Sequence, residues 1–367
     1  MQLAPMMEYT DRHFRHAVRL ITGKTLLYTE MVAANAMSRE RNDSMEEYSS
    51  SISPPPSEKE IRENYSDQYL QRYLGQGQVQ PLEGPSVLQL GGSEPNQLYQ
   101  AAQTVMDMTE RGWCDYTAIN LNCGCPSPKV AGKGSFGAAL MDDPKLVSEL
   151  TTAIHDGCDG KLPVTVKCRI GTDTHTEPFS KDGYAEIDPQ VEYSRLCKFI
   201  EQVASNSPVT DFSVHARIAV LRKSFSPADN RKIPPLKYNF VHRLVEDFPE
   251  LTFTLNGGID TLSQVQEQLE ACPSLNGVMV GRGFAADPWG FSMADKLLYK
   301  SSSIDDGTII VPKNRLELLT EYGKHADKEE ESGDPVKIRR FITKAVMTLF
   351  TAEPNGKRYR IALDEVA

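Results

Sequence analysis

The chain has 367 residues, which is long enough for one barrel-sized domain followed by a smaller unit. Its composition is that of a globular protein, and no apolar run approaches the length of a membrane span. The formal net charge of -10 argues against indiscriminate nucleic-acid binding, although it leaves room for a local basic surface.

The cysteine pattern and the first residues of the chain indicate the cellular compartment in which the protein works. Seven cysteines without a C-x-x-C pair argue against a disulfide framework and against a closed zinc site. Cys123 and Cys125 form a C-x-C pair without further ligands nearby in sequence, so we expect no metal. Because the chain starts almost inside its first strand, we expect either a short strand or missing upstream sequence, which would include any targeting peptide. We expect a cytoplasmic monomer, with an organelle as the alternative location.

Strand-like and helix-like segments alternate through residues 1–295. The strand candidates are Gln2–Pro5, Thr25–Met31, Val87–Leu90, Tyr116–Asn122, Val164–Ile170, Phe212–His215, Thr252–Asn256 and Gly277–Val280. The helix candidates are Asp11–Ile21, Pro95–Arg111, Pro144–His155, Pro189–Ala204, Phe240–Phe248 and Leu262–Ala271. This α/β pattern predicts a (β/α)8 TIM barrel. The alternative is an open doubly wound sheet, but its glycine-rich fingerprint after the first strand is absent.

Polar stretches interrupt this alternation at about residues 39–85 and 172–188. The segment from Arg39 to Tyr65 is polar and broken by prolines, so we expect a flexible surface insertion. Residues 172–188 lack periodicity, and we expect a solvated loop rather than a lid.

The strand pattern stops after Trp289, and residues 310–367 predict a small all-helical domain. The predicted helices are Asn314–Lys328 and Val336–Phe350. Basic residues gather in this part of the chain: Lys337, Arg339, Arg340, Lys344, Lys357, Arg358 and Arg360, with only Glu353 opposing them. Such a charge run is either a solvated face or a surface that binds a polyanion.

Polar or special residues end almost every predicted strand, on the face where barrel enzymes keep their sites. They include Pro5, Met6, Met7, Gln89, Asn122, Cys125, Lys167, His215, Asn256, Gly257, Gly258, Gly281 and Arg282. Gln89 and His215 also suit a satisfied core position. Lys167 lies in an apolar strand, where an ammonium group needs an anionic partner or ligand.

Cys125 lies just after a buried strand, in the turn Asn-Cys-Gly-Cys-Pro. A thiol is small enough to approach a flat substrate, and it is a usable proton donor near its ordinary pKa of about 8.5. The alternative is a structural cysteine that packs as a small hydrophobic residue.

Two glycine pairs follow the seventh and eighth predicted strands, at Gly257–Gly258 and on either side of Arg282. Barrels commonly hold a phosphate in these loops through backbone N–H groups, and an arginine adds charge-assisted hydrogen bonds. Met6 and Met7 offer an apolar surface for a flat ring. Together these residues favour flavin mononucleotide (FMN), with Lys167 facing the pyrimidine edge of the flavin.

At this point the chain resembles the tRNA-dihydrouridine synthases, and most of all their DusA branch, which acts on uridines 20 and 20a of the D-loop. The motifs that carry the resemblance are A-P-M-M-E-Y-T-D-R-H (Ala4–His13), L-L-Y-T-E-M (Leu26–Met31), L-Q-L-G-G-S (Leu88–Ser93), I-N-L-N-C-G-C-P-S (Ile119–Ser127), V-T-V-K-C-R-I-G (Val164–Gly171), V-H-A-R (Val214–Arg217), S-P-A-D-N-R-K-I-P-P-L (Ser226–Leu236), N-G-G-I (Asn256–Ile259) and G-V-M-V-G-R (Gly277–Arg282). They cover nearly the whole chain apart from the insertions.

The resemblance implies an FMN barrel followed by a helical tRNA-binding domain, with NADPH as the reductant. It implies that reduced flavin gives hydride to C6 of uracil while Cys125 protonates C5, and that the stacked base is extruded first. Its implied tRNA contacts are Asn122, Arg231, Lys357 and Arg360.

The chain departs from the family pattern around Ile218–Phe225, where Ile218 replaces the usual lysine, so RNA contacts by this loop are in doubt. Two other hypotheses about the function stay open. One is a flavin barrel that reduces a small molecule, which would have no use for the basic C-terminal helices. The other is a tRNA-binding module without chemistry, against which Cys125, Lys167 and His215 speak together.

Overall fold

The computed structural model describes residues 1–66, 70, 74–75, 84–127, 136–174, 188–222, 225–299, 312, 314–332 and 335–367. Parallel strands close into a barrel in sequence order, with the first strand paired to both the second and the last. The strands are β1 (Gln2–Leu3), β2 (Leu26–Ala33), β3 (Ser86–Gly91), β4 (Ala118–Cys123), β5 (Val164–Arg169), β6 (Asp211–His215), β7 (Thr252–Asn256) and β8 (Gly277–Val280). The predicted TIM barrel is therefore confirmed, and the open sheet is excluded.

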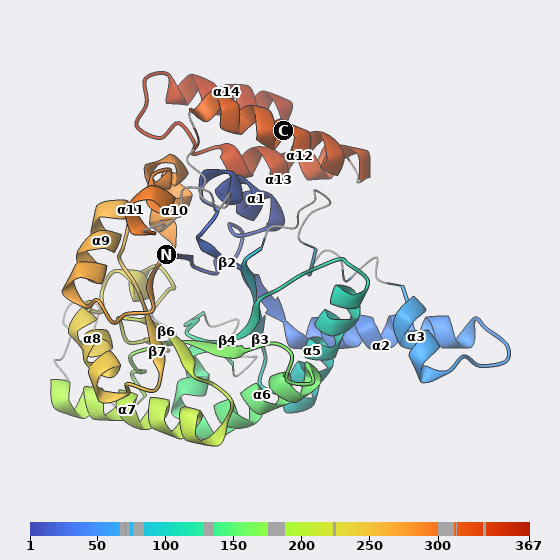
Figure 1. Cartoon of the computed structure of the whole chain (residues 1–367), viewed down its shortest axis with the longest axis horizontal. Helices are drawn as coiled ribbons and strands as arrows, with labels where there is room; N and C mark the ends of the chain where they lie inside the picture. The colour runs from blue at the N-terminus through green and yellow to red at the C-terminus, as the bar shows by residue number, and fades with distance from the viewer. Residues whose placement is uncertain are drawn as a thin grey trace.

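Helices surround the barrel (Figure 1). They are α1 (Arg12–Ile21), α5 (Pro95–Glu110), α6 (Pro144–Gly157), α7 (Pro189–Asn206), α8 (Tyr238–Asp247), α9 (Leu262–Ala271), α10 (Arg282–Ala286) and α11 (Ala294–Leu298). The six predicted helices all form. Three begin at a proline, which is harmless there because the first N–H groups of a helix have no intrahelical acceptor. Among the described residues, no helix combines the length and apolarity needed to cross a bilayer.

The barrel interior contains a belt of hydrogen-bonded polar side chains. Gln89 Nε2 donates to Asn120 Oδ1 at 2.8 Å, and Asn120 Nδ2 donates to Thr165 Oγ1 at 2.8 Å. Gln2 Nε2 donates to Thr254 Oγ1 at 2.9 Å. These amides are buried, so the bonds spare them the cost of lost hydration and fix their orientation.

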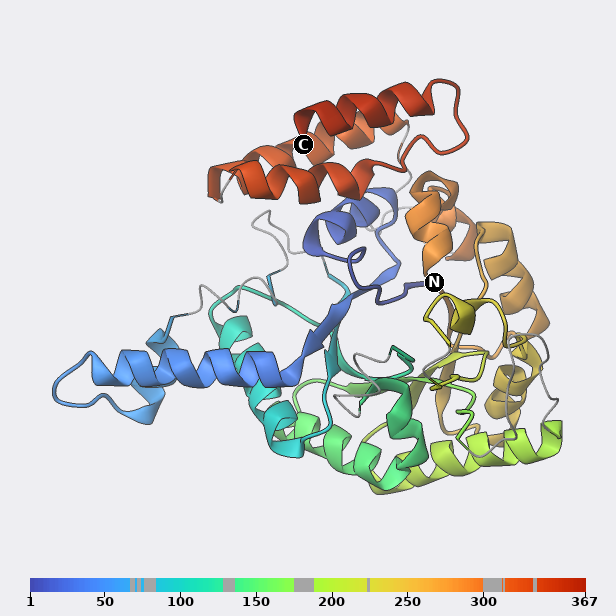
Figure 2. The same ribbon diagram turned by 180° about the vertical axis from the view of Figure 1, so that it is seen from behind.

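The stretch from Arg39 to Tyr65 is an insertion at the surface (Figure 1), as expected, but most of it is helical and not flexible. Residues 34–50 form a long helix, α2 (Ala34–Ser50), and a second helix, α3 (Glu58–Asn64), follows with a capping box. Both helices extend away from the barrel (Figures 1 and 2). Most of residues 66–85 and 172–188 lie outside the described residues, so those expectations stay predictions.

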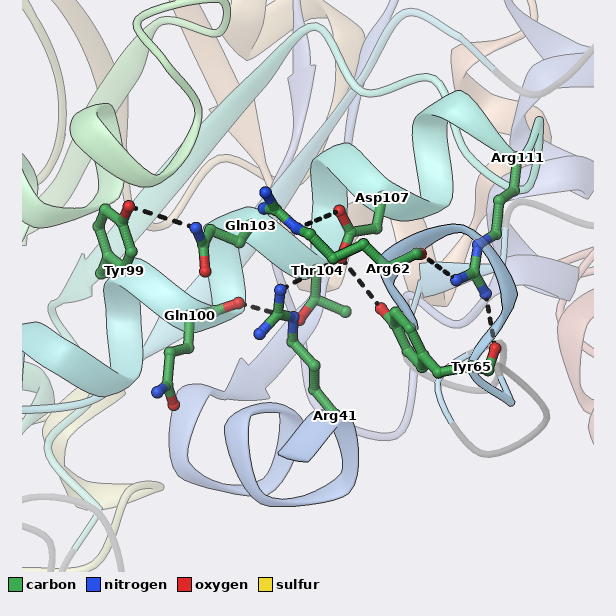
Figure 3. Close-up of polar contacts among 9 residues, drawn as sticks. All are labelled: Arg41, Arg62, Tyr65, Tyr99, Gln100, Gln103, Thr104, Asp107 and Arg111. Atoms are coloured by element: carbon green, nitrogen blue, oxygen red, sulfur yellow. Dashed lines mark hydrogen bonds and ion pairs between the residues drawn. The ribbon is translucent and has the colours of Figure 1, made fainter. Parts of the chain in front are cut away.

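A buried ionic cluster joins this arm to α5 (Figure 3). Arg41 on α2 pairs with Asp107 Oδ2 at 3.3 Å, and the hydroxyl of Tyr65 donates to the same oxygen at 3.3 Å. Arg111 donates to the carbonyl of Tyr65 at 2.9 Å. Charged and polar side chains anchor α2 and α3 together with apolar ones, which explains why this stretch of sequence predicted a flexible insertion.

The C-terminal region is helical, as predicted, and it packs against α1 beside the barrel (Figures 1 and 2). Its helices are α12 (Arg315–Ser332), α13 (Pro335–Val346) and α14 (Gly356–Val366). The prediction of one helix up to Phe350 was wrong, because the chain turns after Val346 and Asn355 takes a left-handed conformation with φ 66° before α14. Tyr322 of α12 donates to the carbonyl of Ile342 at 2.9 Å, which ties α12 to α13.

Candidate active site

The predicted strand-end residues gather at the carboxyl ends of β4 to β8. Register pairs Asn122 with Lys167, and it pairs His215 with both Arg169 and Asn256. Because all strands run parallel, residues paired in this way lie at the same end of the barrel. The barrel therefore brings together side chains that are more than a hundred residues apart.

The turn that carries Cys125 is held by Asn122. Asn122 Oδ1 accepts from the backbone N–H of Gly124 at 2.9 Å and from that of Cys125 at 3.1 Å. Asn122 is only 6% exposed, so the acceptor has a fixed place. Cys125 is partly exposed, in contrast to the fully buried Cys123, whose thiol pKa is raised well above its usual value by burial. Cys125 is thus not the buried structural cysteine of the alternative interpretation.

Arg169 fixes the same turn from β5. Its Nε donates to the carbonyl of Gly124 at 2.9 Å, and its guanidinium also reaches the carbonyls of Ile218 and Asn230. Burial lowers the pKa of Arg169 to about 10, while Cys125 acts in the opposite direction. Sequence reasoning did not single out Arg169. The available signal was its position two residues after Lys167, which places both side chains on the same face of one strand.

Lys167 has the environment expected for a residue that awaits an anion. Its Nζ donates to Asn256 Oδ1 at 3.1 Å, and Asn256 Nδ2 donates to the carbonyl of Met279 at 2.8 Å, which sets the amide orientation. Among the described residues, no carboxylate forms an ion pair with this lysine. Burial, and then the nearby Arg169, lower the pKa of Lys167 to about 8. An anionic ligand beside Nζ would favour the charged form of Lys167 and so offset both effects.

His215 has a buried ring nitrogen that is free to bond to a ligand. Its Nδ1 has no hydrogen-bond partner in the described part of the chain. Burial comes first in lowering the pKa of His215 well below its usual value, and the cations Arg169, Lys167, Arg217 and Arg282 add to it. The imidazole is therefore neutral, and it lies in a positive field of a protein whose net charge is -10. Such a field selects an anionic occupant.

Gly257 allows the backbone to pass close to this histidine. Its φ is 118°, and a Cβ at this position would lie 3.1 Å from His215 Cε1. Tyr238 donates to the carbonyl of Gly257 at 2.6 Å, which fixes the loop, and Gly258 follows with φ 66°. The two glycines thus form a backbone cradle that a larger residue would fill.

The loops after β1 and β8 lie together beside this cradle. A Cβ at Gly281 would lie 3.3 Å from Met6 Sδ, so the two loops touch. Pro5 and Met6 are half-buried, and Met7 is 57% exposed. Arg282 is exposed, whereas Gln89 is buried with its amide nitrogen already bonded to Asn120. Gln89 therefore lies at the inner edge of the site.

Arg231 approaches the same region from a short helical turn, Asp229–Arg231. Its Nε is buried without a partner in the described residues. Burial and then Arg282 lower the pKa of Arg231, while Tyr9 and Cys125 raise it, which places these groups within electrostatic range of one another. Tyr9 is 50% exposed, and sequence reasoning missed it.

Lys357 and Arg360 lie elsewhere. Both are exposed on α14, which packs on α13 and is the outermost helix of the C-terminal region (Figure 1). Other basic residues of this region are already engaged: Arg339 pairs with Glu330 at 2.9 Å, and Lys344 donates to the carbonyl of Glu8. Some basic residues of the C-terminal helices are therefore held within the protein and are less available to bind a polyanion than the sequence suggests.

The chain matches one protein family and curated proteins over nearly its whole length. The model of the "Dihydrouridine synthase (Dus)" family matches residues 2–367. A tRNA-dihydrouridine(20/20a) synthase of Synechocystis sp. is 34% identical over 365 residues, which are 100% of this chain and 88% of that protein. The protein of the same name from Escherichia coli K12 is 34% identical, with 100% and 86% covered. A solved old yellow enzyme homologue from Zymomonas mobilis aligns with a TM-score of 0.45 at 11% identity, over 88% of this chain and 94% of that one.

Proposed function

Because the chain belongs to the dihydrouridine synthase family, we propose that it acts as a tRNA-dihydrouridine(20/20a) synthase, as its relatives are named. Such an enzyme reduces the C5=C6 bond of D-loop uridines in tRNA, here with NADPH as the reductant. The observation that carries the proposal is the partly exposed thiol of Cys125 on a turn fixed by Asn122 and Arg169, next to a cluster of cations.

The residues around Lys167 and His215 fit FMN. The buried nitrogen of His215, the lysine without a carboxylate partner and the cradle at Gly257 and Gly258 suit a flat anionic group with a phosphate. When bound, FMN would supply the hydride that C6 of uracil receives. The set that would hold it is Pro5, Met6, Met7, Gln89, Lys167, His215, Asn256, Gly257, Gly258, Gly281 and Arg282.

Cys125 would act as the proton donor to C5 of the uracil. Asn122 holds its backbone N–H, so the thiol starts from one fixed position. Arg169 lies within electrostatic range of Cys125, and its positive charge would stabilise the thiolate that remains after proton transfer. Proton donation by a positioned group contributes typically about 10²–10⁴-fold to a rate.

The tRNA would be gripped at two places. Arg231 lies within electrostatic range of Cys125 and would meet the backbone or base at the extrusion site, whereas Lys357 and Arg360 on α14 would meet phosphates farther away. Replacing Lys357 and Arg360 by Ala should reduce the slope of log affinity against log salt by roughly 1 per residue. Replacing Lys59, an exposed lysine on α3, is the matched control and should leave the slope unchanged.

The decisive experiment compares wild-type protein with Cys125→Ala. We expect both to bind FMN, to be reduced by NADPH and to bind tRNA, while the variant loses most of the tRNA-dependent reoxidation of the reduced protein. Cys197→Ala, at another partly exposed cysteine, should behave as wild type. Normal reoxidation in Cys125→Ala would remove the proton-donor role. Flavin that is reoxidised without any effect of tRNA would favour a small-molecule reductase, and a protein that takes up no FMN would favour a tRNA-binding module.

A further inference from the structure

Two histidines and a glutamate meet where α12 crosses α1, away from the Cys125 turn. His13 Nδ1 lies 3.0 Å from His325 Nε2. One potential ligand atom from each of His13, His325 and Glu329 lies within 4.8 Å of the other two. The three residues are 4%, 1% and 1% exposed, so the cluster is closed off from solvent.

We propose that His13, His325 and Glu329 bind a divalent transition-metal ion, with zinc as the preferred ion, and that this ion ties the C-terminal helices to the barrel. Two imidazole nitrogens and a carboxylate oxygen are a ligand set that zinc commonly takes, with water in the fourth position. No cysteine takes part in the cluster, so the site is independent of the Cys123–Cys125 pair. It is also separate from the proposed activity, because its ligands lie on α1 and α12 and not at the carboxyl ends of the barrel strands.

The placement of the ligands on helices supports this assignment. His325 and Glu329 are four residues apart on α12, so their side chains project from the same face of that helix. His13 comes from α1 on the other side of the contact, where it is buried in the helix face that α12 covers. An ion at this point would therefore have ligands from two elements that are far apart in sequence.

The imidazole of His325 is only partly satisfied by its contacts within the protein. A hydrogen bond between the two rings satisfies only one nitrogen of each, and His325 Nδ1 has no partner within the described residues.

The spacing of the two imidazole nitrogens needs only modest adjustment, whereas the carboxylate of Glu329 would have to move closer to them. Two ligands at about 2.0–2.1 Å from a tetrahedral zinc ion lie roughly 3.3 Å apart, close to the 3.0 Å between the two nitrogens. Arg12 opposes the site, because its guanidinium holds Glu329 Oε2 at 2.7 Å and adds positive charge nearby. Arg12 is thus a built-in competitor, and its removal should favour the metal.

The test uses the full-length protein. After treatment with EDTA and dialysis, Co²⁺ and Zn²⁺ are titrated in while absorbance and metal content are recorded. We expect one ion per chain, Co²⁺ ligand-field bands without a thiolate charge-transfer band, and a higher melting temperature with metal. His325→Gln and Glu329→Gln should each weaken binding at least about tenfold, whereas Arg12→Gln should tighten it. His155→Gln, at an exposed histidine on α6, is the matched control.

The proposal is overturned if the wild-type protein binds less than a stoichiometric amount of either ion, or if His325→Gln binds as tightly as wild type. It is also overturned if the Co²⁺ complex shows thiolate bands, because cysteines would then be the ligands. Should a variant fail to fold, the wild-type titration decides by itself, since chelator must then lower the melting temperature and added Zn²⁺ must restore it. Flavin content serves as an independent check that the barrel is intact.

Discussion

Replacing Asn122 by Ala should separate the positioning of the thiol from the binding of the cofactor. The side-chain oxygen accepts two backbone hydrogen bonds, at 2.9 Å from Gly124 and 3.1 Å from Cys125. A net contribution of about 0.5–1.5 kcal/mol for each predicts a loss of about 1–3 kcal/mol in the free energy of unfolding. Asn122→Asp keeps the oxygen that accepts both hydrogen bonds, so we expect it to lose less than half as much.

The effect on turnover should be larger than the effect on stability suggests. Without its side-chain acceptor the turn is no longer held at the position of Cys125, and a displacement of the reacting atom by about 1 Å costs on the order of 10²-fold in rate. We expect single-turnover reoxidation of the reduced protein by tRNA to slow by about 10–100-fold in Asn122→Ala. FMN affinity should not change, because Lys167 is held by Asn256 and not by Asn122.

Two results would refute this reasoning. One is wild-type single-turnover kinetics in Asn122→Ala together with the expected loss of stability, which would show that the turn keeps its geometry without the side chain. The other is an equal loss of rate in Asn122→Asp, where the accepting oxygen is still present. A rise in KM for tRNA with an unchanged maximal rate would instead assign Asn122 to tRNA binding alone.

Three further predictions concern packing, pH and the α2–α3 arm. A Cβ on Gly283 would lie 2.4 Å from Asp260 Cα, so Gly283→Ala should lower the free energy of unfolding by about 1–3 kcal/mol in urea titrations, whereas Gly323→Ala on α12, with nothing within 4 Å, should raise it by up to about 1 kcal/mol. The pKa of Lys167 is lowered to about 8 in the folded protein, so the affinity for FMN should be highest and constant below that pH and should fall as the pH rises past it. An affinity that stays constant from below to above pH 8 would contradict a role of the ammonium group. Asp107→Ala leaves its buried arginine partner unpaired, at a cost of about 3–5 kcal/mol, and should make α2 and α3 more sensitive to protease than they are in the wild-type protein, while FMN binding is retained; a variant as resistant as wild type would contradict the anchor.

The family and the elements of the barrel follow from the sequence. The predicted strands Thr252–Asn256 and Gly277–Val280 and the predicted helix Leu262–Ala271 have the bounds that the structure shows. These segments are readable because a strand or a helix is set by side-chain periodicity and by caps within a few residues. The grouping of strand-end residues was predictable for the same reason, since parallel strands in a barrel place their carboxyl ends together.

Predictions from local composition fail where contacts between distant parts of the chain determine the local structure. The polar stretch after Arg39 predicts a flexible surface insertion, yet it is mainly helical, and Arg41 in it pairs with Asp107 on a helix 66 residues away. The C-terminal helix was extended too far because nothing local marks Val346 as its end. In both cases the deciding contacts come from elements distant in sequence, and periodicity carries no information about them.

The sequence by itself therefore determined the barrel, the helical C-terminal region and Cys125 as the candidate thiol, because each depends on a local pattern or on the family motifs. Only the tertiary structure decided which side chains hold that thiol and which histidines meet where α12 packs on α1. Arg169 is directed to the Gly124 carbonyl by the closure of the barrel, and His13 and His325 are brought within 3.0 Å across 312 residues by the docking of α12. Contacts of this kind arise from the packing of whole elements, which no short stretch of sequence specifies.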